Sequence, residues 1–233
     1  SNELYETANQ HDVAGLGEPI SMSTQRLEVG KPLGQWYGMK SVGVSKNGLW
    51  LIENTETKEA EEFKDDMLTN GKYKQYLGNA IPKVNFGWNN YIRYKGIDLS
   101  MQFTSQLGFK ILNEARAYYE NNAIVYNRLK TAAEKQYGQY ILSPAQKQSF
   151  VSYYLENGNY LKLSNISLGY TIPLKTNKYV NNVYFTADNL FTITSYTGLD
   201  PELSNSDPLN SGIDWRDKYP SIRTFTLGMK LKF

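Results

Sequence analysis

Aromatic and charged side chains alternate irregularly along residues 195 to 221, SYTGLDPELSNSDPLNSGIDWRDKYPS. An aromatic ring offers apolar area for stacking against a sugar or a peptide side chain, and charges beside it orient a ligand through hydrogen bonds. The segment is therefore predicted to capture ligand. Such aromatics also occur in interfacial girdles and in ordinary loop packing, and that alternative stays open. The residues expected to contact ligand are Tyr196, Asp200, Asp214, Trp215, Arg216 and Tyr219.

Catalytic and metal-binding patterns are weak. His11 is the only histidine, and its polar surroundings, QHDVAGLGEP, indicate a solvated loop outside any strand. The acidic run at 56 to 66, ETKEAEEFKDD, indicates a solvated loop or a short helix. Asp65, Asp66 and Asn70 lack the alternate-residue spacing of a calcium loop. We therefore predict no catalytic residue, no metal, no cofactor and no enzyme activity.

The elements that must carry the ligand segment are strands. At the end of the chain, RTFTLGMKLKF, the apolar residues from Phe225 to Phe233 alternate with Thr, Gly and Lys. A period of two places all five apolar side chains on one face of a strand. The opposite face, with Lys230 and Lys232, favours water.

Four upstream segments repeat this two-faced pattern: residues 84 to 94, 97 to 104, 161 to 172 and 183 to 193. Leu161 and Leu163 are out of phase with Ile166, Leu168 and Tyr170, which predicts a β-bulge near Ser164. Asn189 is the one exception in the segment 183 to 193. Five strands of similar length follow from residue 84 onward.

The connections alternate in length. Lys95-Gly96 is a tight hairpin link and 173 to 181 a short turn, whereas 107 to 159 and 195 to 221 are long. Short turns on one side and long loops on the other are typical of outer-membrane barrels. Within the first long connection, residues 122 to 137 and the SPAQ sequence at 143 to 146 predict one or two short helices. Upstream, STQRLEV, WYGMKSVGV and LWLIEN are predicted strands.

Composition limits the function classes. The 233 residues carry a net charge of +2, which gives no electrostatic reason to expect nucleic acid. No cysteine is present, so disulfides and thiolate metal sites are excluded. No window is apolar enough for a transmembrane helix, although barrel strands need only about 10 alternating residues. The opening SNELYETANQ is not a signal peptide, so the chain is either cytoplasmic or a mature or internal piece.

Five blocks of sequence resemble the SusC/RagA group of TonB-dependent outer-membrane transporters, and together they cover roughly residues 25 to 233. The two most specific are GNYLKLSNISLGYTIP (158 to 173) and DNLFTITSYTGLDPE (188 to 202). The others are VGKPLGQWYGMKSVGV (29 to 44), YLGNAIPKVNFGWNNYIRYKGIDLS (76 to 100) and GIDWRDKYPSIRTFTLGMKLKF (212 to 233).

The resemblance implies that residues 1 to 233 form the C-terminal portion of a large antiparallel transmembrane β-barrel of about 22 strands, plugged by a domain that this chain does not contain. It implies that 107–159 and 195–221 are extracellular loops and that Phe233 resembles a barrel assembly signal. The implied function is import of glycans or peptides across the bacterial outer membrane. The implied partners are a SusD-like lipoprotein, TonB through the missing N-terminal part, and outer-membrane lipid.

Two other classes of protein stay open. A soluble β-sandwich binding module or adhesin would pack Phe225, Leu227, Met229 and Leu231 against a second sheet rather than expose them to lipid. An outer-membrane hydrolase would need a nucleophile and a base near the barrel rim, and His11 is the one histidine available.

Overall fold

The computed structural model describes residues 9–125, 127–173, 182–203 and 207–230, and all structural statements below concern these residues. The chain divides into two compact units. Unit 1 comprises residues 1–81, 109–157 and 203–218, and unit 2 comprises residues 82–108, 158–202 and 219–233.

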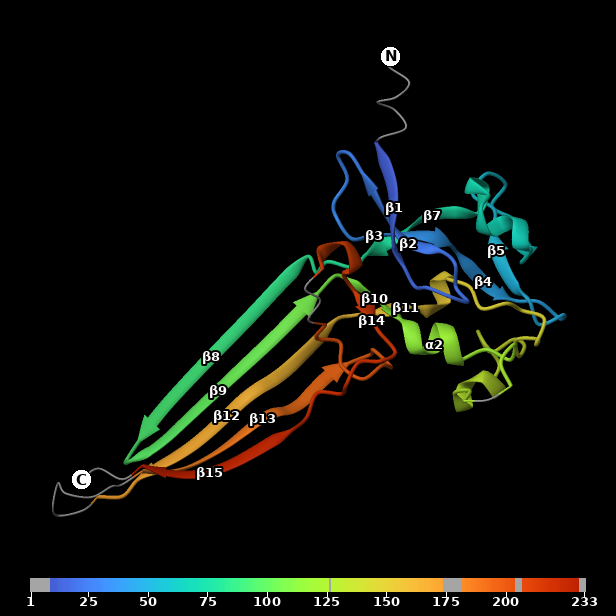
Figure 1. Cartoon of the computed structure of the whole chain (residues 1–233). Coiled ribbons are helices and arrows are strands. Elements are labelled where there is room, and N and C mark those ends of the chain that lie inside the picture. The colour runs from blue at the N-terminus through green and yellow to red at the C-terminus, as the bar shows by residue number, and fades with distance from the viewer. Residues whose placement is uncertain (1–8, 126, 174–181, 204–206, 231–233) are drawn as a thin grey trace. The chain divides into compact units, whose positions relative to one another are not determined.

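Unit 2 is built on one antiparallel sheet of five strands, drawn from green to red in Figure 1. The order across the sheet is β15-β13-β12-β9-β8. The five strands predicted from residue 84 onward are confirmed. Their bounds are β8 Val84–Tyr94, β9 Ile97–Leu107, β12 Tyr160–Thr171, β13 Asn182–Thr194 and β15 Thr224–Lys230. The predicted continuation of the last strand through Leu231 to Phe233 lies outside the described residues.

A tight turn joins β8 to β9, as predicted. Lys95 and Gly96 both have positive φ angles, 46° and 84°, which is the requirement of a type I′ hairpin. The Thr171 N–H donates to the Gly96 carbonyl at 2.7 Å, so the end of β12 lies beside this turn. The predicted short turn at 173 to 181 falls almost wholly outside the described residues.

A β-bulge interrupts β12 where the phase of the sequence changes. Leu163 and Asn165 pair with the adjacent residues Phe103 and Gln102 of β9, so Ser164 is the extra residue. On the β13 side of β12, Leu163 pairs with Phe191 and Asn165 pairs with Asp188. Two residues of β13 therefore lie opposite the single residue Ser164. The predicted bulge is confirmed, and the exception noted at Asn189 falls at the second irregularity, where this residue has a φ of 52°.

The pairing register gives the sheet one apolar face. Leu227, Phe185, Leu168, Leu99 and Ile92 lie opposite one another across all five strands. In β15 the side chains of Phe225, Leu227 and Met229 are 58%, 77% and 68% exposed. Other exposed members of the apolar face are Val84, Phe86, Trp88, Tyr94, Ile97, Leu161, Tyr170, Val183, Phe191 and Ile193.

The opposite face is polar. Tyr91, Ser100, Ser167, Thr186 and Thr226 form one row across the five strands. Amides, hydroxyls and charged groups fill the neighbouring rows, so the two faces of the sheet favour different solvents.

Unit 1 contains three smaller sheets. The first has the order β1-β2-β3-β7 and the second β4-β5-β6, and both are antiparallel. In the third, β10 pairs with β11 in antiparallel and with β14 in parallel orientation. The strands are β1 Gln10–Gly15, β2 Ser23–Glu28, β3 Gln35–Met39, β4 Ser41–Val44, β5 Trp50–Glu53, β6 Ala60–Glu62, β7 Lys74–Asn79, β10 Lys110–Asn113, β11 Leu155–Asn157 and β14 Ile213–Asp214.

Helices are short. The single α-helix of the described chain is α2 Glu114–Tyr119, which starts where the Asn113 side chain accepts a hydrogen bond from the Arg116 N–H at 3.1 Å. The 3₁₀ turns are η1 Asp65–Leu68, η2 Gly71–Tyr73, η3 Lys130–Ala133, η4 Ser152–Tyr154 and η5 Pro208–Asn210. No helix among the described residues is long and apolar enough to cross a membrane.

Unit 1 has its own hydrophobic core. Trp36, Trp50 and Phe150 are fully buried, and the Trp50 ring meets Tyr153 and Tyr154 at centroid distances of 5.1 and 5.9 Å. Residues 109–157, which make up most of the predicted long connection 107–159, belong to this packed unit together with residues of the first third of the chain.

Several local predictions for unit 1 need correction. Of the one or two short helices predicted, the described residues of 122 to 137 contain one short 3₁₀ helix, η3, whereas the sequence at 143 to 146 forms a turn in which Ser143 Oγ accepts from the Ala145 N–H. His11 lies within β1, paired with Leu27, rather than outside any strand. The acidic run contains strand β6 and the start of η1. The upstream strands predicted in STQRLEV, WYGMKSVGV and LWLIEN are confirmed as β2, β3 with β4, and β5.

Candidate functional site

A depression of about 640 Å³ lies on the polar face of the five-stranded sheet. On one side Asp98 accepts a hydrogen bond from the Tyr91 hydroxyl at 2.6 Å, and Arg93 Nε lies 3.2 Å from the same carboxylate oxygen. Aromatic, hydroxyl, amide and charged groups thus converge on one concave surface. Its lining residues are Tyr91, Arg93, Asp98, Ser100, Ser167, Gly169, Thr171, Asn182, Tyr184, Thr186 and Lys230.

Tyr184 is the large side chain of this depression and is flanked by two glycines. Gly169 and Gly228 lie directly opposite it on the two neighbouring strands. A Cβ atom at Gly228 would lie 2.4 Å from Tyr184 Cζ, so the ring lies over the bare backbone of β15. The glycine at 228 is therefore required by close approach of an aromatic ring.

A buried ion-pair cluster lies on the same polar face. Lys162 Nζ is 3.2 Å from Asp200 Oδ2 and 2.7 Å from Glu202 Oε2, and the Lys162 and Asp200 side chains are only 5% and 6% exposed. The Ser221 hydroxyl donates to the same Asp200 oxygen, and the Glu202 N–H donates to Asp200 Oδ1 at 2.9 Å. Burial alone would raise the pKa of the Asp200 carboxyl, but these hydrogen bonds and Lys162 hold it below its ordinary value.

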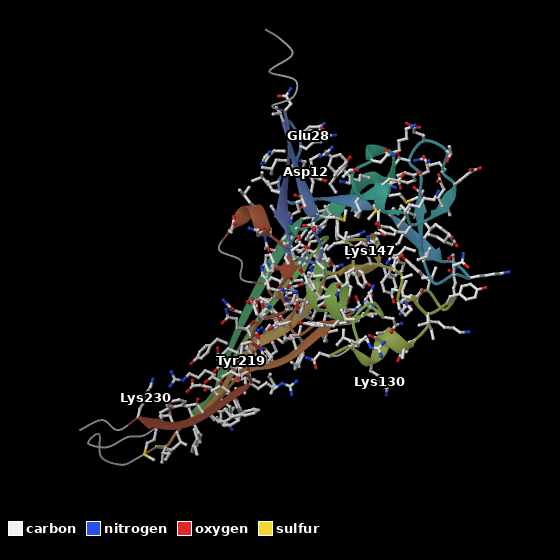
Figure 2. All side chains as sticks on the ribbon, turned by 45° about the vertical axis from the view of Figure 1, so that its right-hand side comes forward. Asp12, Glu28, Lys130, Lys147, Tyr219 and Lys230 are labelled. Carbon is white, nitrogen blue, oxygen red and sulfur yellow. The ribbon has the colours of Figure 1, made fainter. Side chains whose placement is uncertain are left out.

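Three of the six predicted ligand residues belong to unit 2. Tyr196 is buried, with its ring close to the backbone of Gly198. Asp200 is buried in the ion-pair cluster. Tyr219, labelled in Figure 2, is 81% exposed.

The other three belong to unit 1. Asp214 is buried in β14, with Lys218 Nζ 3.6 Å from its carboxylate. Trp215 packs partly against the hydrophobic core. The Arg216 N–H donates to Glu114 Oε2 at 2.6 Å, and its guanidinium carbon lies 3.8 Å from the centroid of the Tyr118 ring. Exposure favours Trp215, Arg216 and Tyr219 as the residues that a ligand can reach, and their role stays a prediction.

Phe233, the predicted assembly signal, lies outside the described residues. Within the described ranges, no group of three or more His, Cys, Asp or Glu residues is arranged to hold a metal ion.

Sequence reasoning missed three features. The Lys162 cluster had a signal, because this lysine stands between two leucines in the stretch whose phase is shifted. The glycines beside Tyr184 and the concave lining of the depression depend on strand order and register, which period-two patterns do not specify. Helix α2 was signalled by Asn113 followed by Glu114, a cap and an acidic first turn.

Comparison with known proteins relates the chain to one group. No protein-family model matches it. It is 29% identical to TonB-dependent receptor P3 of Formosa agariphila, over 93% of this chain and 24% of that protein. It is 30% identical to TonB-dependent receptor SusC of Bacteroides thetaiotaomicron, over 69% of this chain and 16% of that protein.

Solved structures show the same fold. A chain of the RagAB peptide transporter superposes on 94% of this chain with a TM-score of 0.74 and 21% identity, using 24% of its own length. The same importer in its open-open state gives a TM-score of 0.73 over 97% of this chain. The chain spans about a quarter of the length of the first curated relatives, 24% and 27%. In sequence and in fold, the chain belongs to the SusC/RagA group of TonB-dependent receptors.

Proposed function

We propose that this chain forms part of the wall and the external loops of a transporter that imports glycans or peptides across the bacterial outer membrane. The observation that carries the proposal is the exposed apolar face that continues across all five strands of unit 2, opposite a polar face. In the barrel, the apolar face contacts lipid and the polar face lines an aqueous lumen.

Strand length supports this role. The 11 residues of β8 span about 36 Å at about 3.3 Å per residue. Tilted by about 45°, such a strand crosses about 25 Å, the height of the apolar band of an outer-membrane barrel. The five strands supply the C-terminal part of a barrel of about 22 strands, and the plug of that barrel is formed by residues outside these 233.

The lengths of the connections support one orientation of the chain in the membrane. The turn at Lys95-Gly96 and the end of β12 lie at one end of the sheet, and the long connections leave from the other. We place the short connections in the periplasm and residues 107–159 and 195–221 outside the cell. There a SusD-like lipoprotein meets the loops, while TonB acts on the plug. The relatives support this assignment, since they are named TonB-dependent receptors and a peptide importer.

A pair of cysteine variants tests the membrane assignment. The chain has no cysteine, so Leu227→Cys on the apolar face and Thr226→Cys on the polar face each create a single thiol in this segment. In outer membranes that contain the complete receptor, a charged maleimide should modify Thr226→Cys and leave Leu227→Cys unmodified until SDS is added. Equal modification of both in intact membranes would contradict the proposal.

Transport and partnership need separate assays. Cells that express the receptor should accumulate a labelled tryptic peptide mixture or a labelled oligosaccharide mixture only when TonB is present. A SusD-like lipoprotein should co-purify with the receptor. Uptake that is equal without TonB would contradict active import.

The soluble β-sandwich is not favoured. It requires Phe225, Leu227 and Met229 to pack against a second sheet, whereas all three side chains are more than half exposed. A soluble module would also remain in solution without detergent, which a simple extraction checks.

A further inference from the structure

The cluster around Lys162 joins three separate segments of unit 2. Lys162 belongs to β12, Asp200 and Glu202 follow β13, and Ser221 precedes β15. Residues 203–218, which lie between the last two segments, belong to unit 1. Lys162 therefore sits where one excursion of the chain leaves unit 2 and where it returns. We call residues 198–202 the outgoing stem and 219–222 the return stem.

The bulge in β12 explains why this lysine faces the stems. Ile166, Leu168 and Tyr170 set the apolar phase of the strand, and an uninterrupted period of two would continue it through residue 162. The extra residue Ser164 reverses the phase, and its hydroxyl lies 2.7 Å from Thr104 Oγ1. Lys162 consequently pairs with Thr104 and Thr192 on the polar face, away from lipid.

The irregularity in β13 holds the return stem as well. Asn189, with its positive φ angle, donates from Nδ2 to the Ile222 carbonyl at 3.1 Å. The return stem is thus bound at two successive residues, Ser221 through Asp200 and Ile222 through Asn189. The bulge in β12 turns Lys162 toward the stems, and the irregularity in β13 provides a further contact with the return stem.

We propose that Lys162 is a positioning residue, which clamps both stems to the polar face of the sheet and so determines where the chain leaves unit 2 toward the segment 207–218, part of the predicted ligand loop 195–221, and where it rejoins the sheet. The clamp itself stands on the geometry of unit 2, and its effect on ligand capture rests on the proposed transport function. The segment carries Trp215 and Arg216, two of the residues expected to meet ligand.

An ion pair suits this task better than an apolar contact. Buried charges are a poor source of net stability, but a stem that moved away would leave a buried charge unpaired, which is strongly destabilising. Both carboxylates that contact the Lys162 ammonium belong to the outgoing stem. The return stem is then set by Ser221, which uses the Asp200 oxygen that also faces Lys162.

Amide hydrogen exchange in the complete receptor, reconstituted in lipid nanodiscs, tests the clamp directly. In Lys162→Met the amides of both stems should exchange at least about tenfold faster, while those of β9 stay protected, because the opening is local. Lys162→Arg should restore protection, since it keeps the cation. Lys130→Met, an exposed lysine of unit 1, should exchange as wild type. Unchanged stem exchange in Lys162→Met would overturn the proposal.

A milder variant covers the case in which Lys162→Met does not assemble. Ser221→Ala removes the hydroxyl that ties the return stem to Asp200 and leaves the ion pair intact. It should speed exchange in residues 219–222 only. Equal loosening of both stems, or of neither, would contradict the arrangement proposed here.

Uptake separates the clamp from the transport function. With labelled peptide and oligosaccharide mixtures as probes, Lys162→Met should raise the concentration for half-maximal uptake about tenfold and leave the amount of receptor in the membrane unchanged. If loosened stems leave uptake unaltered, the positioning role is wrong. If the wild-type receptor imports neither probe, the transport function fails for them, and exchange still decides the clamp.

Discussion

Glu114 shows how one buried carboxylate can hold a neighbouring segment. It begins helix α2, is 2% exposed, and accepts the Arg216 N–H. Burial raises the pKa of its carboxyl above the ordinary value, although the Arg216 N–H and guanidinium oppose the shift. The segment around Trp215 is therefore held at a cost in desolvation.

The sign of this shift predicts a pH dependence. The pKa of Glu114 is higher in the folded protein than in the unfolded chain. The carboxyl therefore contributes most to the stability of the fold at a pH below its unfolded-state pKa, and this contribution is lost as the pH rises through its folded-state pKa. Exchange of the α2 amides, corrected for intrinsic rates, should therefore show weaker protection at pH 7 than at pH 4.5. Glu114→Gln keeps an acceptor for the Arg216 N–H and should remove this dependence.

The control for that experiment is Glu134→Gln, which changes the same type of residue at an exposed position beside η3. It should leave the pH dependence at α2 as it is in wild type. An α2 protection profile that Glu114→Gln does not alter would show that another group carries the titration.

At the scale of elements, the sheet depends on matched large and small residues across its strands. Tyr184 lies over Gly228, and a Cβ atom there would come within 2.4 Å of the ring. Gly228→Ala should therefore displace Tyr184 and destabilise the folded receptor by about 1–3 kcal/mol, the usual cost of overpacking. The measurement is the temperature at which the folded form disappears in semi-native SDS electrophoresis.

Gly87→Ala is the matched control. Gly87 lies on the polar face of β8, and a Cβ atom there meets nothing within 4 Å. It should behave as wild type or slightly better, since alanine restricts the unfolded chain. Equal loss of stability in both variants would point to strand propensity instead of the ring contact.

The same scale explains what the sequence could and could not predict. The long strands were predictable because each alternates over many residues, and the bulge because Leu161 and Leu163 break the phase. Residues 122 to 137 have helix-forming composition, but side chains of this part of the chain bond backbone groups of strands β4 and β5 and of the connection itself. Gln146 accepts from the Trp50 N–H, Gln139 from the Val44 N–H, and Asn122 donates to the Ala132 and Leu142 carbonyls.

The two glutamine contacts join residues 95 and 96 positions apart, so no local pattern reveals them. For the candidate site, too, the sequence predicts the types of residue but not their burial. The ligand residues were chosen by type, and type alone did not distinguish exposed Tyr219 from buried Tyr196. Burial is set by the fold of the loops, which is a tertiary property.

For the whole molecule, the edges of the sheet matter most. Within the described residues, β8 and β15 each pair on one side only, with β9 and β13. An open strand edge is not tolerated in lipid, because its N–H and C=O groups would be unsatisfied. If unit 2 lies in a membrane, strands from the remainder of the receptor must pair with both edges, consistent with relatives about four times as long.

The proposed membrane position of unit 2 also predicts unequal effects of the same substitution at adjacent residues. Leu168 lies in a row of the apolar face that crosses all five strands, and Ser167 lies in a row of the polar face. A lysine on the lipid face costs about 2–4 kcal/mol at mid-bilayer and less toward the interface, whereas a lumen position carries no such cost. Leu168→Lys should therefore lower the amount of heat-modifiable receptor in the outer membrane, and Ser167→Lys should leave it near wild type. Because the two residues are neighbours in β12, the strand that carries the lysine is the same, and the two variants differ in which face of the sheet the lysine enters. If instead Ser167→Lys were the damaging change, the polar face would be the one packed against protein or lipid, and the assignment of the two faces would have to be reversed.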